Sequence, residues 1–176
     1  MAHWNTRGLR GSAFEDMINL SNQLYKKQGL AVIQKVPTPI TPIEVNNREH
    51  TITKAYFGEK STVDFIGVVQ GIAVCFDAKE TQTKNFPLKN VHQHQMDFME
   101  AFTAQEGVAF LLIHFKASGE IFFLPWRQLH NCYELSLNGG RKSIPYSDFD
   151  PAYLVRNAEG FPVHYLEALS TYLETG

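Results

Sequence analysis

The amino-acid sequence predicts a mixed α/β fold in which helices flank a central mixed β-sheet. Three observations indicate it: residues 13–28 have apolar side chains at helical spacing, two pairs of apolar runs are each joined by a short turn, and a second helical pattern lies near the carboxyl end. Helix and strand patterns thus alternate along one chain, which is typical of mixed α/β proteins.

Composition favours one domain that comprises residues 1–176. Of the 176 residues, 44% are apolar and 19% are charged, which is typical of globular proteins and sufficient for one core. No apolar run approaches the roughly 20 residues that a membrane helix needs, and the first residues lack the apolar centre of a secretory signal. We therefore expect a cytoplasmic protein with no membrane partner.

The first elements are predicted to be a helix and a short strand. Ser12 precedes the helical pattern of residues 13–28, and Glu15 follows Ser12 by three positions, which is the spacing of a capping box. Gly29 ends the pattern, because glycine commonly terminates helices. The apolar run at residues 30–36 then predicts a strand.

A proline-rich arm is predicted at about residues 36–54. Pro37, Pro39 and Pro42 lack backbone N–H groups and have fixed φ angles, which excludes a helix or a central strand. We expect an extended arm, and an ordinary loop is the alternative.

A tight hairpin and a second helix are predicted next. Residues 62–69 and 72–80 are β-branched and aromatic runs, and only Gln70 and Gly71 separate them. The pattern from Pro87 to about residue 103 is helical, and proline suits a first helical turn.

The last third of the chain is predicted to form two strands, an irregular segment and a closing helix. Residues 107–115 and 120–126 are the strands, joined through residues 117–119. The closing helix is predicted from the spacing of Val163, Leu166, Leu169 and Leu173.

Two acids and a lysine occupy unusual positions in the predicted hairpin. Asp64 begins one strand, while Asp77 and Lys79 end the other, although aspartate is depleted in strands and lysine is rarely buried unpaired. The hairpin brings the two carboxylates together, and they repel each other unless a cation lies between them. Carboxylates suit Mg²⁺, and the lysine can orient a nucleophile or stabilise developing charge. The pattern therefore indicates metal-assisted phosphodiester hydrolysis. The alternative is that both acids are solvated and that Lys79 pairs with one of them.

Five segments resemble, in order, the RecU family of Holliday-junction resolvases, which share the restriction-endonuclease-like PD-(D/E)XK core. They are KVPTPI, KAYFGEKSTVDFIGV, FDAKET, FPLKNVHQHQ and GVAFLLIHF, and the similarity extends from Arg7 to about residue 123. The resemblance implies a homodimer that resolves four-way DNA junctions by paired symmetric nicks in recombination and repair. It implies Mg²⁺ as the cofactor, with Mn²⁺ as a substitute, and a strand-exchange recombinase as a further partner. It also implies that the arm at residues 36–54 is a protruding stalk that contacts the junction.

The resemblance assigns roles to individual residues. Thr62, Asp64, Asp77 and Gln95 fall at the family's metal-ligand positions, and Lys79 falls on its catalytic lysine. Glu15 occupies the position of an additional acid near such sites, although its role in the capping box is an equal alternative.

The chain departs from the family's usual pattern at three places. Asp77 replaces a glutamate, Val63 replaces a threonine, and the segment between Thr81 and Phe86 is one residue shorter. Two alternatives to a junction resolvase therefore stay open. One is a PD-(D/E)XK nuclease that acts on other DNA structures, and the other is a non-catalytic DNA-binding or recombination-modulating protein with this fold.

Basic residues are concentrated in the first third of the chain. Although the net charge is −2, residues 1–60 contain eight Lys or Arg and five Asp or Glu, which mildly favours a polyanionic partner. For Arg7 and Arg10 the alternative is that they have no binding role, because flexible tails are commonly basic. The residues expected to bind DNA are Arg7, Arg10, Lys35, Arg48, Lys54 and Lys60.

His92 and His94 suggest a zinc pair at first sight. Residues two apart on a helix point to different faces, so the two imidazoles cannot easily share one ion. We expect His94 and Gln95 to face the nuclease site or the DNA, with a plain surface helix as the alternative. Cys75 lies in an apolar run and is expected in the core.

Overall fold

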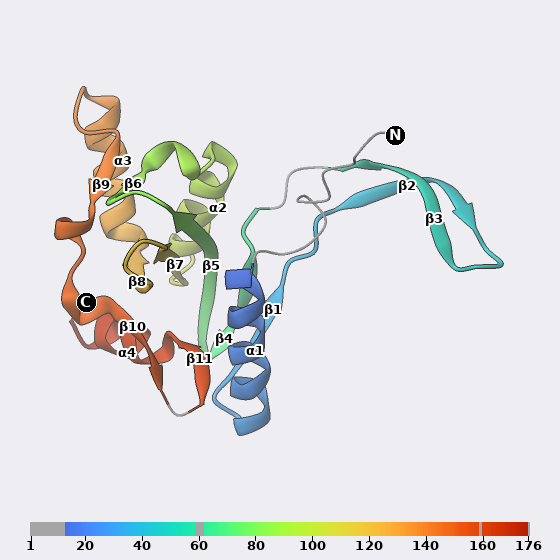
Figure 1. Ribbon diagram of the computed structural model, residues 1–176, viewed down its shortest axis with the longest axis horizontal. Coiled ribbons are helices and arrows are strands. Elements are labelled where there is room, and N and C mark those ends of the chain that lie inside the picture. The colour runs from blue at the N-terminus through green and yellow to red at the C-terminus, as the bar shows by residue number, and fades with distance from the viewer. Residues whose placement is uncertain (1–12, 59–61, 159, 176) are drawn as a thin grey trace.

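The computed structural model describes residues 13–58, 62–158 and 160–175 and confirms a mixed α/β fold with a central sheet (Figure 1). The strands of this sheet are β1 (Ala31–Lys35), β4 (Phe65–Val69), β5 (Ile72–Thr81), β7 (Val108–Phe115), β8 (Glu120–Pro125), β10 (Leu154–Ala158) and β11 (Phe161–His164). They are ordered β1-β4-β5-β7-β8-β10-β11. Only the β5–β7 pair of this sheet is parallel within the described residues, so a crossover connects these two strands.

Helices cover both faces of the sheet and create two hydrophobic cores. Residues of α1 (Ala13–Gln28) and α4 (Leu166–Thr175) pack in one core, and residues of α2 (Gln93–Thr103) and α3 (Trp126–Leu137) pack in the other; in Figure 1, α2 and α3 are in the upper part of the molecule. The α1 side contains a stack of Phe65, Phe76 and Phe110. The other side contains buried residues such as Met99 and Leu129. In the part of the chain described here, no helix is both long and apolar enough to span a membrane.

The predicted helix at residues 13–28 is confirmed as α1. Its first turn carries Glu15 and Asp16 and its last turn carries Lys26 and Lys27, so both ends complement the helix dipole. Gly29 follows with φ +72°, the left-handed conformation that ends helices, and the N–H of Leu30 donates to the carbonyl of Tyr25. Ser12, the predicted capping residue, lies outside the described residues.

The predicted tight hairpin is confirmed as β4 and β5. Gln70 and Gly71 have φ angles of +48° and +88°, as in the two-residue turn whose twist matches that of antiparallel strands. The turn sets the register, in which Phe65 is paired with Phe76. This register decides which residues of the two strands face each other.

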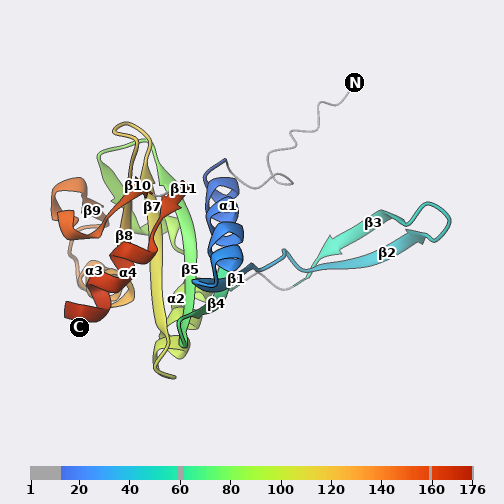
Figure 2. The same ribbon diagram turned by 90° about the horizontal axis from the view of Figure 1, so that it is seen from below.

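The proline-rich segment is a second hairpin, separate from the main sheet. It consists of β2 (Ile40–Asn46) and β3 (Thr51–Phe57), and Figures 1 and 2 show it extending away from the layers of helices and strands. At its base the N–H of Gly58 donates to the carbonyl of Pro39 over 2.9 Å. The strand β3 pairs with β2 as far as Phe57, three residues beyond Lys54.

The prediction of a helix starting at Pro87 was wrong. Pro87 ends β6 (Asn85–Pro87), which pairs with β9 (Ser143–Pro145), and the 3₁₀ turn η2 (Leu88–Asn90) precedes α2. Leu88 and Val91 are buried in the core beneath α2, so tertiary packing holds this segment out of the helix.

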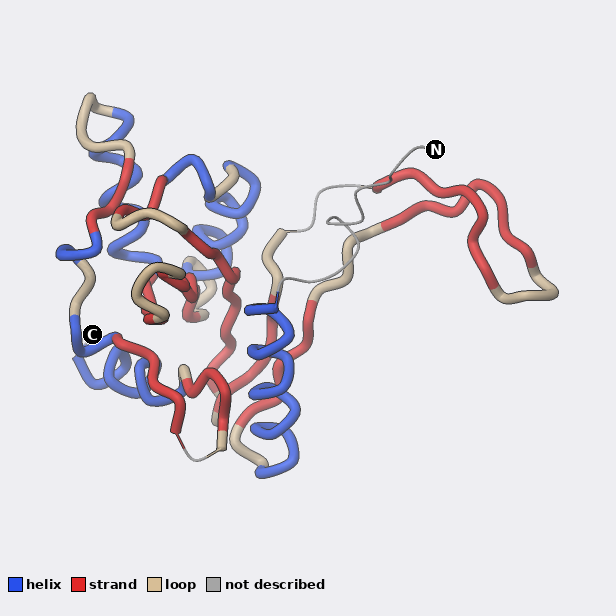
Figure 3. Tube along the Cα trace, viewed as in Figure 1, coloured by secondary structure: helices blue, strands red, loops and turns tan. Residues whose placement is uncertain are grey.

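The region after β8 was also predicted incorrectly. The segment taken to be irregular contains α3, the 3₁₀ turns η3 (Tyr146–Asp148) and η4 (Pro151–Tyr153), and β9 to β11 (Figure 3). The closing helix begins at Leu166, since Val163 belongs to β11, which pairs with β10.

Candidate active site

Asp64 and Asp77 meet at the open end of the β4–β5 hairpin. Because Phe65 is paired with Phe76, the residues that follow in the register, Asp64 and Asp77, lie across from each other. The Asp64 carboxylate accepts a hydrogen bond from the backbone N–H of Ala78 over 3.0 Å. Asp77 is 1% exposed, so one carboxylate is half-buried and the other is fully buried.

Lys79 lies on the same face of β5 as Asp77, two residues further on. Its Nζ atom lies 3.0 Å from Asp77 Oδ1 and donates a hydrogen bond to Gln95 Oε1 over 3.2 Å. The lysine side chain is 16% exposed. A mostly buried cation thus bridges an acid of the sheet and an amide of α2.

The amino-terminal turn of α2 supplies Gln95 to this cluster. Gln95 Nε2 donates to Asp77 Oδ2, and Gln95 Oε1 accepts from the backbone N–H of His92, the residue that caps α2. The cap therefore fixes the orientation of the Gln95 amide. The family resemblance predicted Gln95 near Asp77, but its hydrogen bond with the His92 N–H was not predicted. The three-residue spacing from His92 to Gln95 at a helix start is the signal that could have revealed that bond.

The electrostatic environment of Asp77 disfavours its negative charge. Burial raises the pKa of this carboxyl well above its usual value, the proximity of Asp64 raises the pKa further, and Lys79 only partly offsets both effects. The nearby Cys75 thiol has its pKa raised to about 12, first by burial and then by Asp77, so it is a neutral core residue as expected. Among the residues that the structure describes, Lys79 is the cation that stabilises the charged form of Asp77.

The donor groups fit a hard divalent cation. Asp77 Oδ1 is buried, and its near neighbour among the described residues is the Lys79 ammonium group at 3.0 Å, which leaves a second lone pair of this oxygen for a ligand. Two carboxylates and an amide oxygen match Mg²⁺, which is usually bound by one or two carboxylates and keeps several waters. No cluster of three or more His, Cys, Asp or Glu side chains occurs in the described ranges, which gives no support to a zinc site at His92 and His94. Instead their rings lie nearly parallel, with centroids 5.5 Å apart.

Thr62 and Glu15 are the other two predicted site residues that the structure describes. Thr62 is half-buried, two residues before Asp64. Glu15 forms an ion pair of 2.6 Å with Lys35, at the end of β1 where the arm begins. Glu15 and Lys35 therefore lie near the base of the arm. The ion pair between them was not expected from the sequence.

The predicted DNA-binding residues are only partly described by the structure. Arg48 lies in the turn of the β2–β3 hairpin and Lys54 lies in β3, and both side chains are exposed. Arg7, Arg10 and Lys60 lie outside the described residues.

Comparison with known proteins identifies the family. The model of the family "RecU: Recombination protein U" matches residues 9–171. Among curated proteins, the chain is 42% identical over 172 residues to Holliday junction resolvase RecU of Lactococcus lactis, with 95% of this chain and 80% of the relative covered. It is 41% identical over 171 residues to the protein of the same name from Levilactobacillus brevis, with 94% and 85% covered. It is 39% identical over 161 residues to that of Oceanobacillus iheyensis, with 89% and 79% covered. The chain belongs to the RecU family.

Proposed function

We propose that this chain is a structure-specific endodeoxyribonuclease that resolves four-way DNA junctions. The observation that carries the proposal is the cluster of Asp64, Asp77, Lys79 and Gln95, which combines two facing acids with a buried lysine. The relatives named Holliday junction resolvase RecU support a branched DNA substrate. Paired symmetric nicks need two such sites, so we also propose a homodimer that acts in the cytoplasm.

Mg²⁺ is the proposed cofactor, with Mn²⁺ as a substitute. Asp64 and Asp77 would hold the metal ion, together with the amide oxygen of Gln95 and the hydroxyl of Thr62. When bound, the metal ion supplies positive charge that neutralises the scissile phosphate and lowers the pKa of water. For the Gln95 oxygen to reach the ion, it would exchange its present partners, Lys79 and the His92 N–H, for the ion.

Lys79 is the proposed catalytic cation. Its ammonium group is held beside Asp77 and is mostly shielded from solvent, so its charge acts through a medium that screens it weakly. From this position it can orient the attacking water and stabilise the charge that develops on the phosphate oxygens. Asp64 keeps its orientation through the Ala78 N–H, so it needs no rearrangement before reaction.

The β2–β3 hairpin is the proposed junction-contacting stalk within a single nuclease domain. It carries Arg48 and Lys54 away from the catalytic cluster, where both can neutralise phosphates. A strand-exchange recombinase is a further proposed partner, by analogy with the family.

Incubation with labelled DNA tests this function. A four-way junction and a linear duplex that contains the same arm sequences are each incubated with Mg²⁺, Mn²⁺ or EDTA. We expect paired nicks in the junction, with either metal ion and not with EDTA, and little cutting of the duplex. Equal cutting of both substrates would identify a general nuclease, and binding without cutting would identify a non-catalytic DNA-binding protein.

A further inference from the structure

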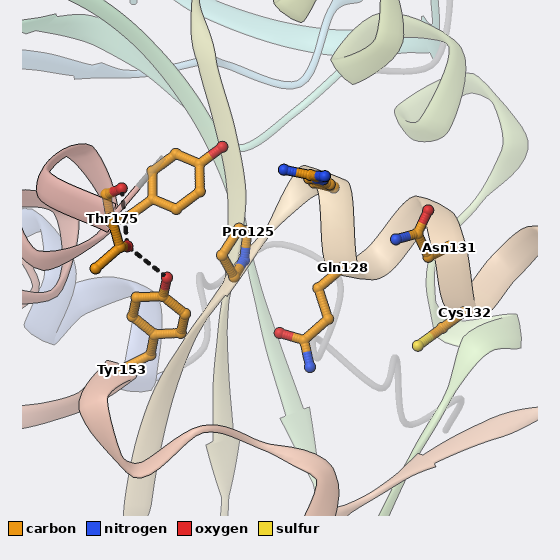
Figure 4. Close-up of a pocket in the computed structure, with 8 residues that line it drawn as sticks. Pro125, Gln128, Asn131, Cys132, Tyr153 and Thr175 are labelled. Carbon is orange, nitrogen blue, oxygen red and sulfur yellow. Dashed lines mark hydrogen bonds between the residues drawn. The ribbon is translucent and has the colours of Figure 1, made fainter.

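A cavity with mixed aromatic and polar walls lies between α3, η4 and α4 (Figure 4). Its volume is about 300 Å³, which is at the lower end of the range for small-molecule sites. The cavity lies against β8 and contains none of the proposed active-site residues, which lie just before β4, on β5 and on α2. Its walls are formed by Pro125, Arg127, Gln128, Asn131, Cys132, Tyr153, Tyr172 and Thr175.

One wall of this cavity is aromatic and rests on the core. The rings of Tyr153 and Tyr172 have centroids 6.4 Å apart, and each ring packs against Phe123, at 5.8 Å and 5.9 Å. The Tyr153 hydroxyl lies 3.4 Å from Thr175 Oγ1, a contact drawn in Figure 4. Because Phe123 is buried, the two tyrosines are supported from behind and present a preformed aromatic surface.

The opposite wall is a polar face of α3. Arg127 and Asn131 are four residues apart, as are Gln128 and Cys132, so two neighbouring rows of the helix line the cavity. In Figure 4, Gln128, Asn131 and Cys132 lie across from Tyr153. Gln128 Nε2 donates to the carbonyl of Asp148 over 3.1 Å, which orients its amide.

The residues that line the cavity include one positive charge. Arg127 is the one charged residue among the eight that line it, and it makes no ion pair within the described ranges. The Cys132 thiol adds no negative charge, because burial, and then Asp148, raise its pKa above the usual value. A cation, an aromatic surface and amide groups therefore line one space of about 300 Å³.

We propose that this cavity binds one nucleotide unit, a base together with its phosphate. The tyrosine rings offer surfaces on which any base can stack. Asn131 can donate to and accept from the base edge, and the Arg127 guanidinium matches the geometry of a phosphate group. The unit can come from a single DNA strand or from a free nucleotide. The inference does not depend on the proposed cleavage reaction, because the two sites share no residue.

Fluorescence anisotropy in EDTA tests this proposal without cleavage. The probe is a labelled oligothymidylate of about 12 nucleotides, and an abasic oligomer of the same length provides phosphates without bases. We expect Arg127→Ala and Tyr172→Leu each to weaken oligothymidylate binding by about tenfold. The control Arg156→Ala, an exposed arginine of β10 outside the cavity, is expected to bind as the unchanged protein does. Thymidine monophosphate as a competitor distinguishes the two sources: displacement indicates a free nucleotide, and no displacement indicates a strand.

Two results would overturn the proposal. One is that Arg127→Ala and Tyr172→Leu, with melting curves like that of the unchanged protein, bind oligothymidylate with unchanged affinity. The other is that the abasic oligomer binds as tightly as oligothymidylate. Oligothymidylate binding is measured in EDTA, without cleavage, so failure here is distinguishable from failure of the proposed nuclease function, which the junction-cleavage assay tests.

Discussion

At the scale of single residues, Lys79 is held between Asp77 Oδ1 at 3.0 Å and Gln95 Oε1 at 3.2 Å. A preorganised charge of this kind stabilises the transition state more than the bound substrate. We therefore expect Lys79→Ala to lower kcat for junction cleavage by about 10²–10³ with little change in KM. Single-turnover cleavage over a range of enzyme concentrations measures both quantities.

Lys116→Ala is the matched control for this prediction. Lys116 pairs with Glu80 at 3.2 Å, and neither residue belongs to the proposed site. Its removal is expected to leave kcat unchanged. A Lys79→Ala variant with a raised KM and normal kcat would show that Lys79 binds DNA and does not take part in the chemistry.

Asp77 makes stability depend on pH in the absence of metal. Its folded-state pKa lies above the unfolded value of about 4, so the folded chain binds the proton more tightly. Stability from this group is present at low pH and is lost as pH rises through the window between the unfolded and folded values. In EDTA, Asp77→Asn is therefore expected to melt at a higher temperature than the unchanged protein at neutral pH, with a smaller difference near pH 4.

Thermal melts from pH 4 to 8 in EDTA measure this difference. Each kcal/mol corresponds to about 2–4 °C in a chain of this size. Asp97→Asn is the control, because Asp97 is exposed on α2 and is expected to change little. A lower melting temperature for Asp77→Asn at neutral pH would mean that the charged form of Asp77 stabilises the fold.

At the scale of secondary-structure elements, the β2–β3 hairpin is expected to contribute to the affinity for a four-way junction and much less to the affinity for ordinary duplex. Its described side chains are exposed except for the half-buried Asn46, and the hydrogen bond between Gly58 and Pro39 closes its base. Replacing Ile40–Phe57 with two glycines should therefore leave the melting temperature nearly unchanged. We expect junction affinity to fall by about tenfold or more and duplex affinity to fall much less.

Mobility-shift titrations on both DNAs at two salt concentrations measure this prediction. Arg48→Ala combined with Lys54→Ala is the milder variant, and it should reduce the salt dependence of junction binding by up to about two units of slope. Equal losses on the two DNAs, or no loss on either, would mean that the hairpin does not recognise the junction.

The elements also show which parts of the fold follow from local sequence. The helix at α1 and the β4–β5 hairpin were predictable, because capping acids, a terminal glycine and a two-residue turn act within a few residues. The helix α3 was missed, since only Leu129 and Ser136 are buried along it and its polar residues resemble a loop. Its position depends on packing of Leu129 into the core on the α2 side, which no local pattern reveals.

At the scale of the whole molecule, the candidate site combines a local part with a non-local part. Asp64, Asp77 and Lys79 belong to one hairpin, so their spacing along the sequence was sufficient to predict that they lie close together. Gln95 lies on α2, in the crossover that connects β5 and β7, and its position near these residues was expected only from the family resemblance. The ion pair of Glu15 with Lys35 likewise depends on how α1 packs on β1, which periodicity does not specify.

The central claim is that Asp64 and Asp77 form the centre that cuts four-way DNA. The most direct measurement compares cleavage and binding of one labelled junction by the unchanged protein, Asp64→Asn and Asp77→Asn, in Mg²⁺ and at one salt concentration. We expect both variants to lose at least about a thousandfold in cleavage rate, because each lacks a carboxylate ligand for the metal ion. Junction affinity should be equal or tighter, because less negative charge faces the phosphates. Cleavage by either variant at the rate of the unchanged protein would contradict the claim.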